Sequence, residues 1–501
     1  MLAVRPGARV YLHQAFRCCP YAGTVSSQTH DYLVANGYVI TRNPLEAEVC
    51  VVNTCGSDAR QAELTWEALS AIRANGPERA VVVTGCLVSI EPKALGAALD
   101  GLPNHARFDP RHLSGLDEVF APSVVPFADV QPALHNEYAG NDFAEGWLHV
   151  LASTGCLGTC AFCAIRRATG RPRSTPIAGV LAEMARGLEA GRHDQLLVST
   201  DLSAWGTDLG TDVVALLEAV TDAPGDLVLG AESFEPTLFL EHFERLLPLF
   251  ASGRWAFIGL PIQSGSARVL RSMERTYDPD DVLRAVDRLR AAAPELVVRT
   301  DLLYGFGDET DAEFEDSVRV SRAFSLPSFN AYQQRPGTPP VQLPLATLSA
   351  RRERALAEMQ ARALAGLPPL RRWGVTPTPR PLPSDATPAE VPADAPWLTA
   401  AGIAWITKTV AQFTALVARK GPVALGGGWA LTGAEARADA VALRLQGPGG
   451  GVREVGLRAP EWPGAALARS ERFAAWVLGP ATLDGAEDAA LKRLFVALGL
   501  G

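Results

Sequence analysis

The sequence lacks any long run of apolar residues. No stretch approaches the ~20 consecutive apolar residues that a membrane-spanning helix needs. The opening residues, MLAVRPGARVYLH, also lack the apolar segment of a secretory signal peptide. We therefore expect a protein that has no membrane partner and works in the cytoplasm.

Positive charge is also in short supply. Of the 501 residues, 46 are Lys or Arg and 55 are Asp or Glu, which leaves a net charge of −9. Proteins that grip nucleic acid over a broad face usually carry an excess of basic residues, so we do not expect nucleic acid as a partner. The hydrophobic share of 48% and charged share of 20% are typical of a soluble globular protein. The length suggests two to four domains.

Cysteine is absent from the last two thirds of the chain. The eight cysteines occupy positions 18, 19, 50, 55, 86, 156, 160 and 163. A secreted disulfide scaffold would spread them differently and would follow a signal peptide. This distribution favours reduced thiols in the cytosol, where iron–sulfur clusters are assembled.

Three of these cysteines lie close together, at Cys156, Cys160 and Cys163. Three residues and then two separate them, so one loop can wrap three thiolates around a metal centre. A disulfide needs an even number of partners, and a structural zinc site needs a fourth Cys or His, which does not follow. Three thiolates suit a cubane iron–sulfur cluster with one open iron. The alternative is three unrelated core thiols, which have no reason to share a loop.

The first hundred residues alternate between strand and helix patterns. We expect strands at 8–17, 38–41, 48–53 and 80–84, with helices at 27–36 and 58–74. This alternation predicts an α/β fold with an open parallel sheet, in which ligands bind beyond the carboxyl ends of the strands. Residues 100–145 are rich in loop-forming residues and are expected to form a linker with short helices.

Cys19, Cys55 and Cys86 each lie where one of these strands ends. Parallel strands would bring the three loops to one edge of the sheet, which makes a second three-thiolate site possible. From the spacing alone, unconnected thiols are an equally good interpretation. Cys50 lies inside a strand, and its expected role is core packing.

The middle of the chain repeats strand-then-helix units. The expected strands are 148–151, 196–199, 227–229, 257–260 and 297–303, and the expected helices are 177–190, 212–220, 238–250, 280–292 and 311–324. This number of units over ~180 residues is too small for an eight-stranded barrel and predicts a partial (β/α)6 barrel. Its chemistry should lie at the carboxyl ends of the strands.

The remaining residues predict a different kind of domain. A charged helix is expected at 347–366, and a proline-rich linker follows it. Beyond the linker we expect a helix at 402–419, a hairpin of 440–446 with 452–457, a strand at 473–478 and a helix at 484–498, which together make a small α+β domain. The glycine run at 425–428 is expected to be a turn. The predicted division is 1–125, a linker at 126–146, 147–372, a linker at 373–396, and 397–501.

The cysteine triplet, with Phe162 before its last cysteine, resembles the signature of radical S-adenosylmethionine (AdoMet) enzymes. The longer string GCLGTCAFCAIRRATGRPRSTP resembles the methylthiotransferases among them. This resemblance implies that the three cysteines hold a [4Fe–4S] cluster whose open iron binds AdoMet. Arg166 stands where that family usually has Pro, and Thr169 and Thr175 stand where it usually has Arg, so the loop lip that faces the substrate is altered.

The resemblance extends to the N-terminal cysteines. Methylthiotransferases carry Gly-Cys-Pro-like, Asn-Thr-Cys and Thr-Gly-Cys motifs, which here read CCP (18–20), NTC (53–55) and TGC (84–86). In the family these cysteines hold an auxiliary [4Fe–4S] cluster, which implies Cys19, Cys55 and Cys86 as ligands. Cys19 is chosen over Cys18 because Ser26 and the Gly-Tyr pair at 37–38 then match the family's intervals.

The polar residues at the barrel strand ends also resemble the family. The matching strings are TDLSAWGTD (200–208), SFEP (233–236), LPIQSGS (260–266) and TDLLYGFGDET (300–310). The resemblance implies contacts to AdoMet or substrate, and the expected cofactor-binding residues are Phe162, Asp201, Ser203, Ser233, Glu235 and Gln263. Each alone would more often be a cap or turn residue.

The resemblance implies replacement of a C–H bond by C–S–CH3, with two [4Fe–4S] clusters, AdoMet and an electron donor such as flavodoxin or ferredoxin. This reaction needs no pair of acidic and basic side chains, because the cofactors perform its difficult step. No TRAM domain, the usual C-terminal domain of the family, is recognisable, and from residue 385 onward basic and acidic residues number eleven each. These features and the Asp201 variant favour a peptide or protein substrate.

Three alternatives stay open. The first is methylthiolation of tRNA adenosine. The second is a radical AdoMet enzyme for sulfur insertion or other C–H chemistry, which the product mass would distinguish. The third is a binding module without enzymatic activity, which the iron content would test.

Overall fold

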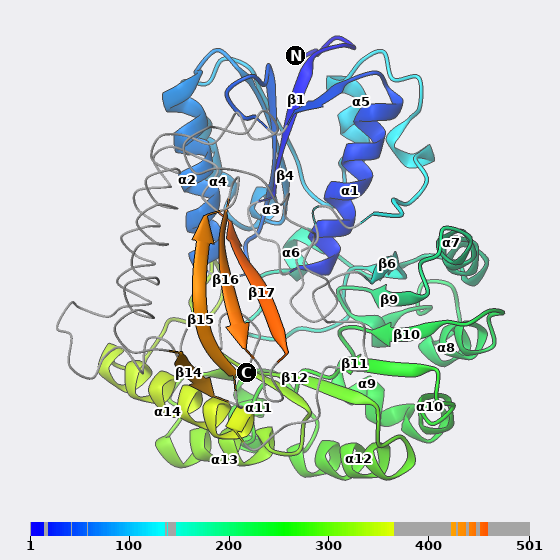
Figure 1. Ribbon diagram of the computed structural model, residues 1–501, viewed down its shortest axis with the longest axis vertical. Coiled ribbons are helices and arrows are strands. Elements are labelled where there is room, and N and C mark those ends of the chain that lie inside the picture. Colours follow the sequence, from blue (N-terminus) through cyan, green and yellow to red (C-terminus); the bar gives the residue numbers. More distant parts are fainter. Residues whose placement is uncertain are drawn as a thin grey trace.

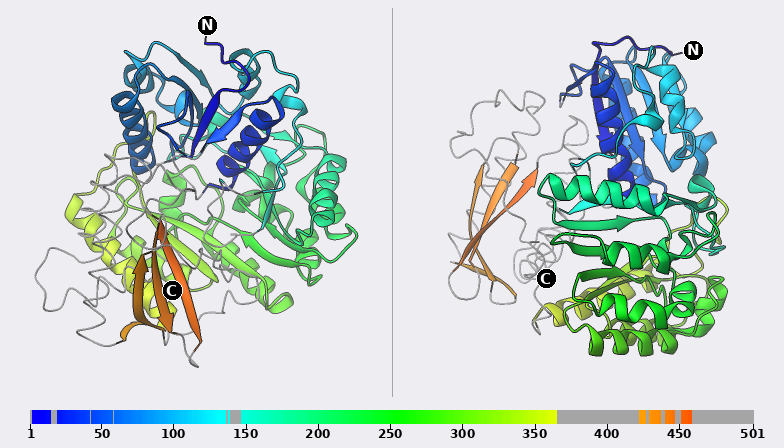
Figure 2. Two further views of the ribbon diagram at one scale, coloured as in Figure 1. Left: turned by 45° about the horizontal axis from the view of Figure 1, so that its top comes forward. Right: turned by 90° about the vertical axis from the view of Figure 1, so that its right-hand side faces the viewer.

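The computed structural model describes residues 2–14, 19–41, 43–57, 59–135, 138, 147–364, 422–426, 429–436, 440–446 and 451–458. Three larger sheets organise this part of the chain (Figure 1). The two parallel sheets follow one another along the long axis, and the antiparallel third sheet lies to one side of both (Figure 2). Among the described residues, no helix is both long and apolar enough to cross a bilayer.

The N-terminal sheet is built from short buried strands. Its strands are β1 (Arg9–Gln14), β2 (Val39–Thr41), β3 (Val49–Thr54), β4 (Ala80–Gly85) and β5 (His105–Phe108). They are arranged in the order β2-β1-β3-β4-β5, and every pairing is parallel. Both central strands, VCVVNT and AVVVTG, are buried throughout, as apolar runs in a parallel sheet require. The predicted open parallel α/β sheet is therefore confirmed.

Helices cover this sheet and connect its strands. They are α1 (Pro20–Ala35), α2 (Ala59–Asn75), α3 (Leu87–Ile90), α4 (Pro92–Leu99) and α5 (Leu116–Val119), with 3-10 turns η1 (Leu113–Gly115) and η2 (Phe127–Asp129). Helix α1 begins seven residues before the predicted start at 27, because Pro20 is well suited to the first helical turn. The prediction of a linker over 100–145 missed β5, whose side chains are all exposed or half-buried and give no apolar run.

The central sheet has six parallel strands. They are β6 (Leu148–Leu151), β9 (Asp194–Val198), β10 (Val228–Ala231), β11 (Trp255–Gly259), β12 (Val297–Tyr304) and β13 (Leu326–Ala331). The order β13-β12-β11-β10-β9-β6 leaves β6 and β13 as open edges, so the barrel is partial, as predicted. The last strand, LPSFNA, was not predicted, because it contains a proline and is only partly buried.

The helices of the central region alternate with its strands. They are α7 (Ile177–Glu189), α8 (Val213–Thr221), α9 (Pro236–Glu241), α10 (Phe243–Phe250), α11 (Ala267–Ser272), α12 (Pro279–Ala292) and α13 (Asp311–Ser321). The helix expected at 238–250 is split at His242 into α9 and α10. The aromatic core beneath these helices contains Phe234, Phe239, Phe250 and Trp255.

The described C-terminal residues form strands only. After α14 (Leu345–Leu364), a meander of β14 (Val423–Gly426), β15 (Trp429–Ala436), β16 (Ala440–Gln446) and β17 (Val452–Arg458) pairs antiparallel in that order. The predicted hairpin of 440–446 with 452–457 is confirmed. The glycine run expected as a turn begins at the end of β14, and the strand β15 after it was missed. The linker at 373–396 and the elements expected at 402–419, 473–478 and 484–498 lie outside the described residues.

A buried arginine joins the N-terminal domain to the end of the central sheet. Arg335 lies after β13 and is 5% exposed. Its Nε donates to the Gly56 carbonyl at 3.1 Å, and its Nη2 pairs with Glu91. Gln333 on the same segment accepts a hydrogen bond from the Ala59 amide at 2.7 Å. The loop that carries Cys55 is therefore fixed by residues almost three hundred positions later in the chain.

Loss of this arginine should destabilise the junction. We expect Arg335→Ala to lower the free energy of unfolding by roughly 3–5 kcal/mol, because Glu91 would be left without its partner in a partly buried site. Urea titration would measure the change. Arg319→Ala removes an exposed pair with Asp316 and serves as the control, with an expected loss below ~0.5 kcal/mol. Equal losses in both variants would contradict the importance of the buried contact.

Glu183 makes stability depend on pH. It is buried in α7, and burial raises the pKa of its carboxyl group from 4.5 to about 8, although Arg186 opposes the shift. Because the folded state holds this proton more tightly than the unfolded state, stability is lost as pH rises from about 4.5 to about 8. Glu183→Gln should therefore be more stable than wild type by roughly 2–4 kcal/mol above pH ~8, and no more stable near pH ~4. Urea titrations across this range would measure the difference.

The exposed Glu189 on the same helix offers the matched control. Glu189→Gln should change the free energy of unfolding by less than ~0.5 kcal/mol at every pH. A Glu183→Gln curve parallel to that of wild type would show that this carboxyl group does not cause the pH dependence.

Candidate functional site

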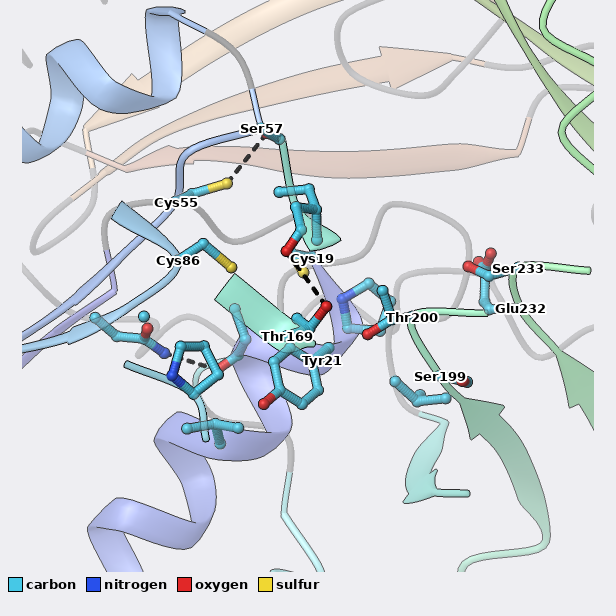
Figure 3. A pocket seen from close by; sticks show the side chains of 18 of the residues that line it. Cys19, Tyr21, Cys55, Ser57, Cys86, Thr169, Ser199, Thr200, Glu232 and Ser233 are labelled. Carbon is cyan, nitrogen blue, oxygen red and sulfur yellow. Dashed lines mark hydrogen bonds between the residues drawn. The ribbon is translucent and has the colours of Figure 1, made fainter. Parts of the chain in front are cut away.

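The three N-terminal cysteines meet at one edge of their sheet. Cys19 immediately precedes α1, Cys55 follows β3, and Cys86 follows β4. Because β1, β3 and β4 are parallel neighbours, the loops after them lie together, and all three cysteines line one cavity of about 440 Å³ (Figure 3). The structure thus brings together the set expected from the sequence. Cys18 lies outside the described residues, and Cys50 is fully buried within β3.

The local charge balance of these thiols suits a cationic centre. The pKa of Cys86 is raised well above its ordinary value, first by burial and then by the neighbouring Cys55, Cys19 and Cys163. Thiolates this close repel one another unless a metal compensates their charge, and metal binding removes thiol protons outright. The hydroxyl of Ser57 lies 3.1 Å from the Cys55 sulfur and can donate to it. The donor set therefore fits an iron–sulfur cluster.

The loop of the cysteine triplet is held closed at its base. Strands β7 (Ser153–Thr154) and β8 (Arg173–Ser174) pair antiparallel, and the Cys156 amide donates to the Gly170 carbonyl at 3.1 Å. The Gly158 amide donates to the Cys156 sulfur at 3.1 Å. A Cβ atom at residue 158 would lie 3.2 and 3.3 Å from the sulfurs of Cys156 and Cys160. A side chain at residue 158 would therefore crowd both sulfurs, and glycine leaves them the space that a bound cluster would need.

Asp201 lies directly beside this triplet. It follows β9 and is buried, and its Oδ2 lies 3.3 Å from the Cys156 sulfur, which donates to it. Burial is the main reason that the pKa of Asp201 is raised to about 6. Asp201, which was expected to contact AdoMet or substrate, therefore lies beside Cys156 and is not among the residues that line the cavity.

Glu235, Ser203 and Phe162 form a second group near the triplet. Glu235 caps α9 by accepting from the amides of Thr237 and Leu238 at 2.8 and 3.2 Å, and it also pairs with the half-buried Arg275. The Arg275 guanidinium lies 5.8 Å from the centre of the Phe162 ring. Ser203 donates to the Glu235 carbonyl at 3.2 Å. These side chains therefore make structural contacts as well as lying near the cysteines.

Ser233 and Gln263 line the cavity at the ends of two neighbouring strands. Ser233 follows β10 and Gln263 follows β11, with φ of 67° and 65°. Residues other than glycine rarely adopt this left-handed conformation, and such strain clusters at functional sites. In Gln263 it is held in place by the Asp301 carbonyl and the Leu303 amide, at 2.8 and 2.7 Å. These two predicted contact residues therefore face the cysteines Cys19, Cys55 and Cys86 across the cavity.

The sequence did not predict a group of three charged side chains in the same wall of the cavity. Glu232, Arg299 and Asp301 line the cavity, and the guanidinium of Arg299 lies 3.3 Å from Glu232 Oε2 and 3.0 Å from Asp301 Oδ1. Arg299 and Asp301 are two apart on β12, so they share one face of that strand. Side chains alternate between the two faces of a strand, so the sequence VVRTDLLY could have shown that Arg299 and Asp301 lie on the same face. Nothing near Glu232 in the sequence indicated that Arg299 is its partner.

Of the three altered positions in the triplet loop, only Thr169 lines the cavity. It lies at the end of α6 (Arg166–Thr169). The Thr175 hydroxyl donates to the Leu151 carbonyl at 2.9 Å, and Arg166 is exposed. Of these three positions, Thr169 is therefore the one that can affect the shape of the cavity directly.

Two family models match the chain. The Radical SAM superfamily matches residues 150–320, and the "Uncharacterized protein family UPF0004" matches residues 15–101. The first range includes the cysteine triplet, and the second includes Cys19, Cys55 and Cys86.

Curated relatives carry more specific names. The ribosomal protein uS12 methylthiotransferase RimO of Methylococcus capsulatus is 31% identical over 366 residues, which are 69% of this chain and 81% of the relative. The enzyme of that name from Thermus thermophilus is 33% identical over 314 residues, which are 59% and 69% of the two chains. The threonylcarbamoyladenosine tRNA methylthiotransferase of Xenopus laevis is 27% identical over 346 residues, or 65% of this chain and 61% of the relative.

The chain thus spans less than two thirds of the frog relative's length. Because some relatives are named for tRNA, the comparisons do not support the prediction that nucleic acid is excluded. Members of the matched family use [4Fe–4S] clusters and AdoMet. With its cysteine loops at the carboxyl ends of two parallel sheets and a bacterial relative matched over 81% of that relative's length, this chain belongs to the radical AdoMet methylthiotransferase family.

Proposed function

We propose that the protein replaces a C–H bond by C–S–CH3 on a peptide or protein substrate. The observation that supports this most is the shared cavity, which has Cys19, Cys55 and Cys86 on one wall and the strand ends of the central sheet on the other. In this proposal Cys156, Cys160 and Cys163 hold a [4Fe–4S] cluster that binds AdoMet, and the N-terminal three hold an auxiliary [4Fe–4S] cluster. When bound, these cofactors would supply the radical that removes hydrogen and the sulfur that replaces it, and a second AdoMet would supply the methyl group on that sulfur.

The two walls of the cavity would perform different tasks. Tyr21, Val25 and Leu113 give the N-terminal side apolar surfaces that exclude water. The polar wall contains Ser233, Gln263 and Arg299 with its partners Glu232 and Asp301. These side chains would orient the substrate by hydrogen bonds. An electron donor such as flavodoxin or ferredoxin completes the proposal.

Several observations support a protein substrate. The uS12 enzymes match with 31% and 33% identity, against 27% for the frog tRNA enzyme. The net charge of −9 works against the phosphate backbone, which proteins usually neutralise with Lys and Arg. Arg299 is already shared by two carboxylates, so this wall carries a negative charge in excess and favours neutral or hydrogen-bond-donating groups.

Modification of tRNA adenosine is the second candidate, because relatives of this chain are named for it. Titration of labelled tRNA at increasing salt would distinguish the two, since phosphate contacts give a steep salt dependence. Mass spectrometry of peptide and tRNA substrates after turnover should find a gain of SCH3 minus H on the peptide. That gain on tRNA alone would overturn the protein substrate, and any other mass change would overturn methylthiolation.

Iron content tests the assignment of the cysteines. Anaerobically reconstituted wild type should hold about eight irons per chain, and Cys86→Ala and Cys160→Ala should each hold about four. Cys50→Ala is the control and should keep them all, because Cys50 is buried within β3 and burial raises its pKa to about 12. Full iron in Cys86→Ala would contradict the auxiliary site.

Arg299 tests the role of the polar wall. Arg299→Ala should lower kcat/KM by roughly thirtyfold or more, because Glu232 and Asp301 would be left with unbalanced charge in the cavity. Its iron content should equal that of wild type, since the ion pairs of Arg299 described above are with Glu232 and Asp301, which are not cluster ligands in this proposal. Arg245→Ala removes a surface pair with Asp212 and should retain activity within about twofold. Equal activities in the two variants would remove Arg299 from substrate binding.

A further inference from the structure

Two histidines and an aspartate converge at a second place in the N-terminal part of the chain, without any of the cysteines. His30 and Asp31 are consecutive residues in α1, and His135 lies in the segment between η2 and β6. Asp31 Oδ1 lies 3.0 Å from His30 Nδ1 and 3.0 Å from His135 Nε2. The two imidazole rings meet edge to face, with centroids 5.1 Å apart.

This geometry is close to that of a metal site. Zinc binds histidine nitrogens and carboxylate oxygens at ~2.0–2.2 Å in tetrahedral arrangement, which sets neighbouring ligand atoms ~3.3 Å apart. The distances from the shared Asp31 oxygen to the two nitrogens, both 3.0 Å, need little adjustment to admit an ion. The three side chains are between 22% and 36% exposed, so an ion and a water ligand can reach them.

The hydrogen bonds that Asp31 Oδ1 makes with His30 and His135 can be replaced by metal bonds when the imidazoles are neutral.

We infer that His30, Asp31 and His135 form a zinc site, with water as the fourth ligand, independent of the two cysteine sites. Two imidazoles and one carboxylate are a ligand set typical of zinc and related transition metals. Mg²⁺ and Ca²⁺ prefer oxygen ligands throughout, so they should not compete.

The position of the site gives it a structural consequence. The segment that carries His135 is held on its other side by Arg186, which donates to the Pro132 carbonyl at 2.7 Å, and by Arg192, which donates to the Leu134 carbonyl at 2.7 Å. Both arginines belong to the α7–β9 region of the central domain. Zinc would therefore fasten α1, which begins beside Cys19, to the connection that enters the central domain.

The test is zinc content after both sets of cysteines are filled with iron. Reconstituted protein is incubated with excess Zn²⁺ and Mg²⁺, freed of unbound ions by gel filtration, and analysed for zinc, magnesium and iron. We expect about one zinc per chain and no magnesium in wild type. Asp31→Asn and His135→Gln preserve side-chain size and hydrogen bonding, and they should retain less than a tenth of that zinc with unchanged iron.

His105→Gln is the matched control, since this exposed histidine lies in the same domain and contacts the Leu102 carbonyl. It should keep the zinc. A thermal-unfolding midpoint that rises with zinc in wild type and in His105→Gln, but not in the other two variants, would support the site independently. Iron-loaded wild type without zinc would overturn it, and so would zinc retained equally by Asp31→Asn and His135→Gln. Neither result depends on whether the enzyme forms a methylthio product.

Discussion

The arrangement of the molecule depends on two parallel sheets whose functional ends must face each other across a domain boundary. A parallel sheet presents its loops at one edge only, so each domain contributes one row of loops. The guanidinium of Arg335 holds the loops of the two domains in position relative to each other, because it bonds to Gly56 and Glu91 beside the Cys55 loop. A buried guanidinium suits this task because it is always charged and its donors have fixed directions.

The opposed loops give the cavity two chemically different walls. One carries three thiols, and burial together with the neighbouring cysteines raises the pKa of Cys86 among them. The other carries Ser233 and Gln263 in left-handed conformations and a charged group around Arg299. Such a wall is costly to build, because both the strained backbone and the clustered charges oppose folding, and the large apolar core beneath it must offset that cost.

Local patterns predicted much of this fold, and long-range contacts explain what they missed. The buried runs of β3 and β4 were readable because parallel strands need apolar side chains on both faces. By contrast, most side chains of β5 and β13 are exposed or half-buried, so these strands have no apolar run and are defined by their pairing with a neighbouring strand. The cysteines could be placed because each follows a recognisable strand. Arg335 could not, since its partners lie more than two hundred residues away.

The segment after β13 has one more property. Gln333 and Arg335 bond to the loop of Cys55 and to Glu91, and Arg167, in the helix α6 that follows Cys163, donates to the carbonyl of Pro336. A single stretch of chain therefore touches the surroundings of both cysteine sets. An insertion in this stretch would therefore disturb the loops beside both cysteine sets at once, although it would lie far from either set in the sequence.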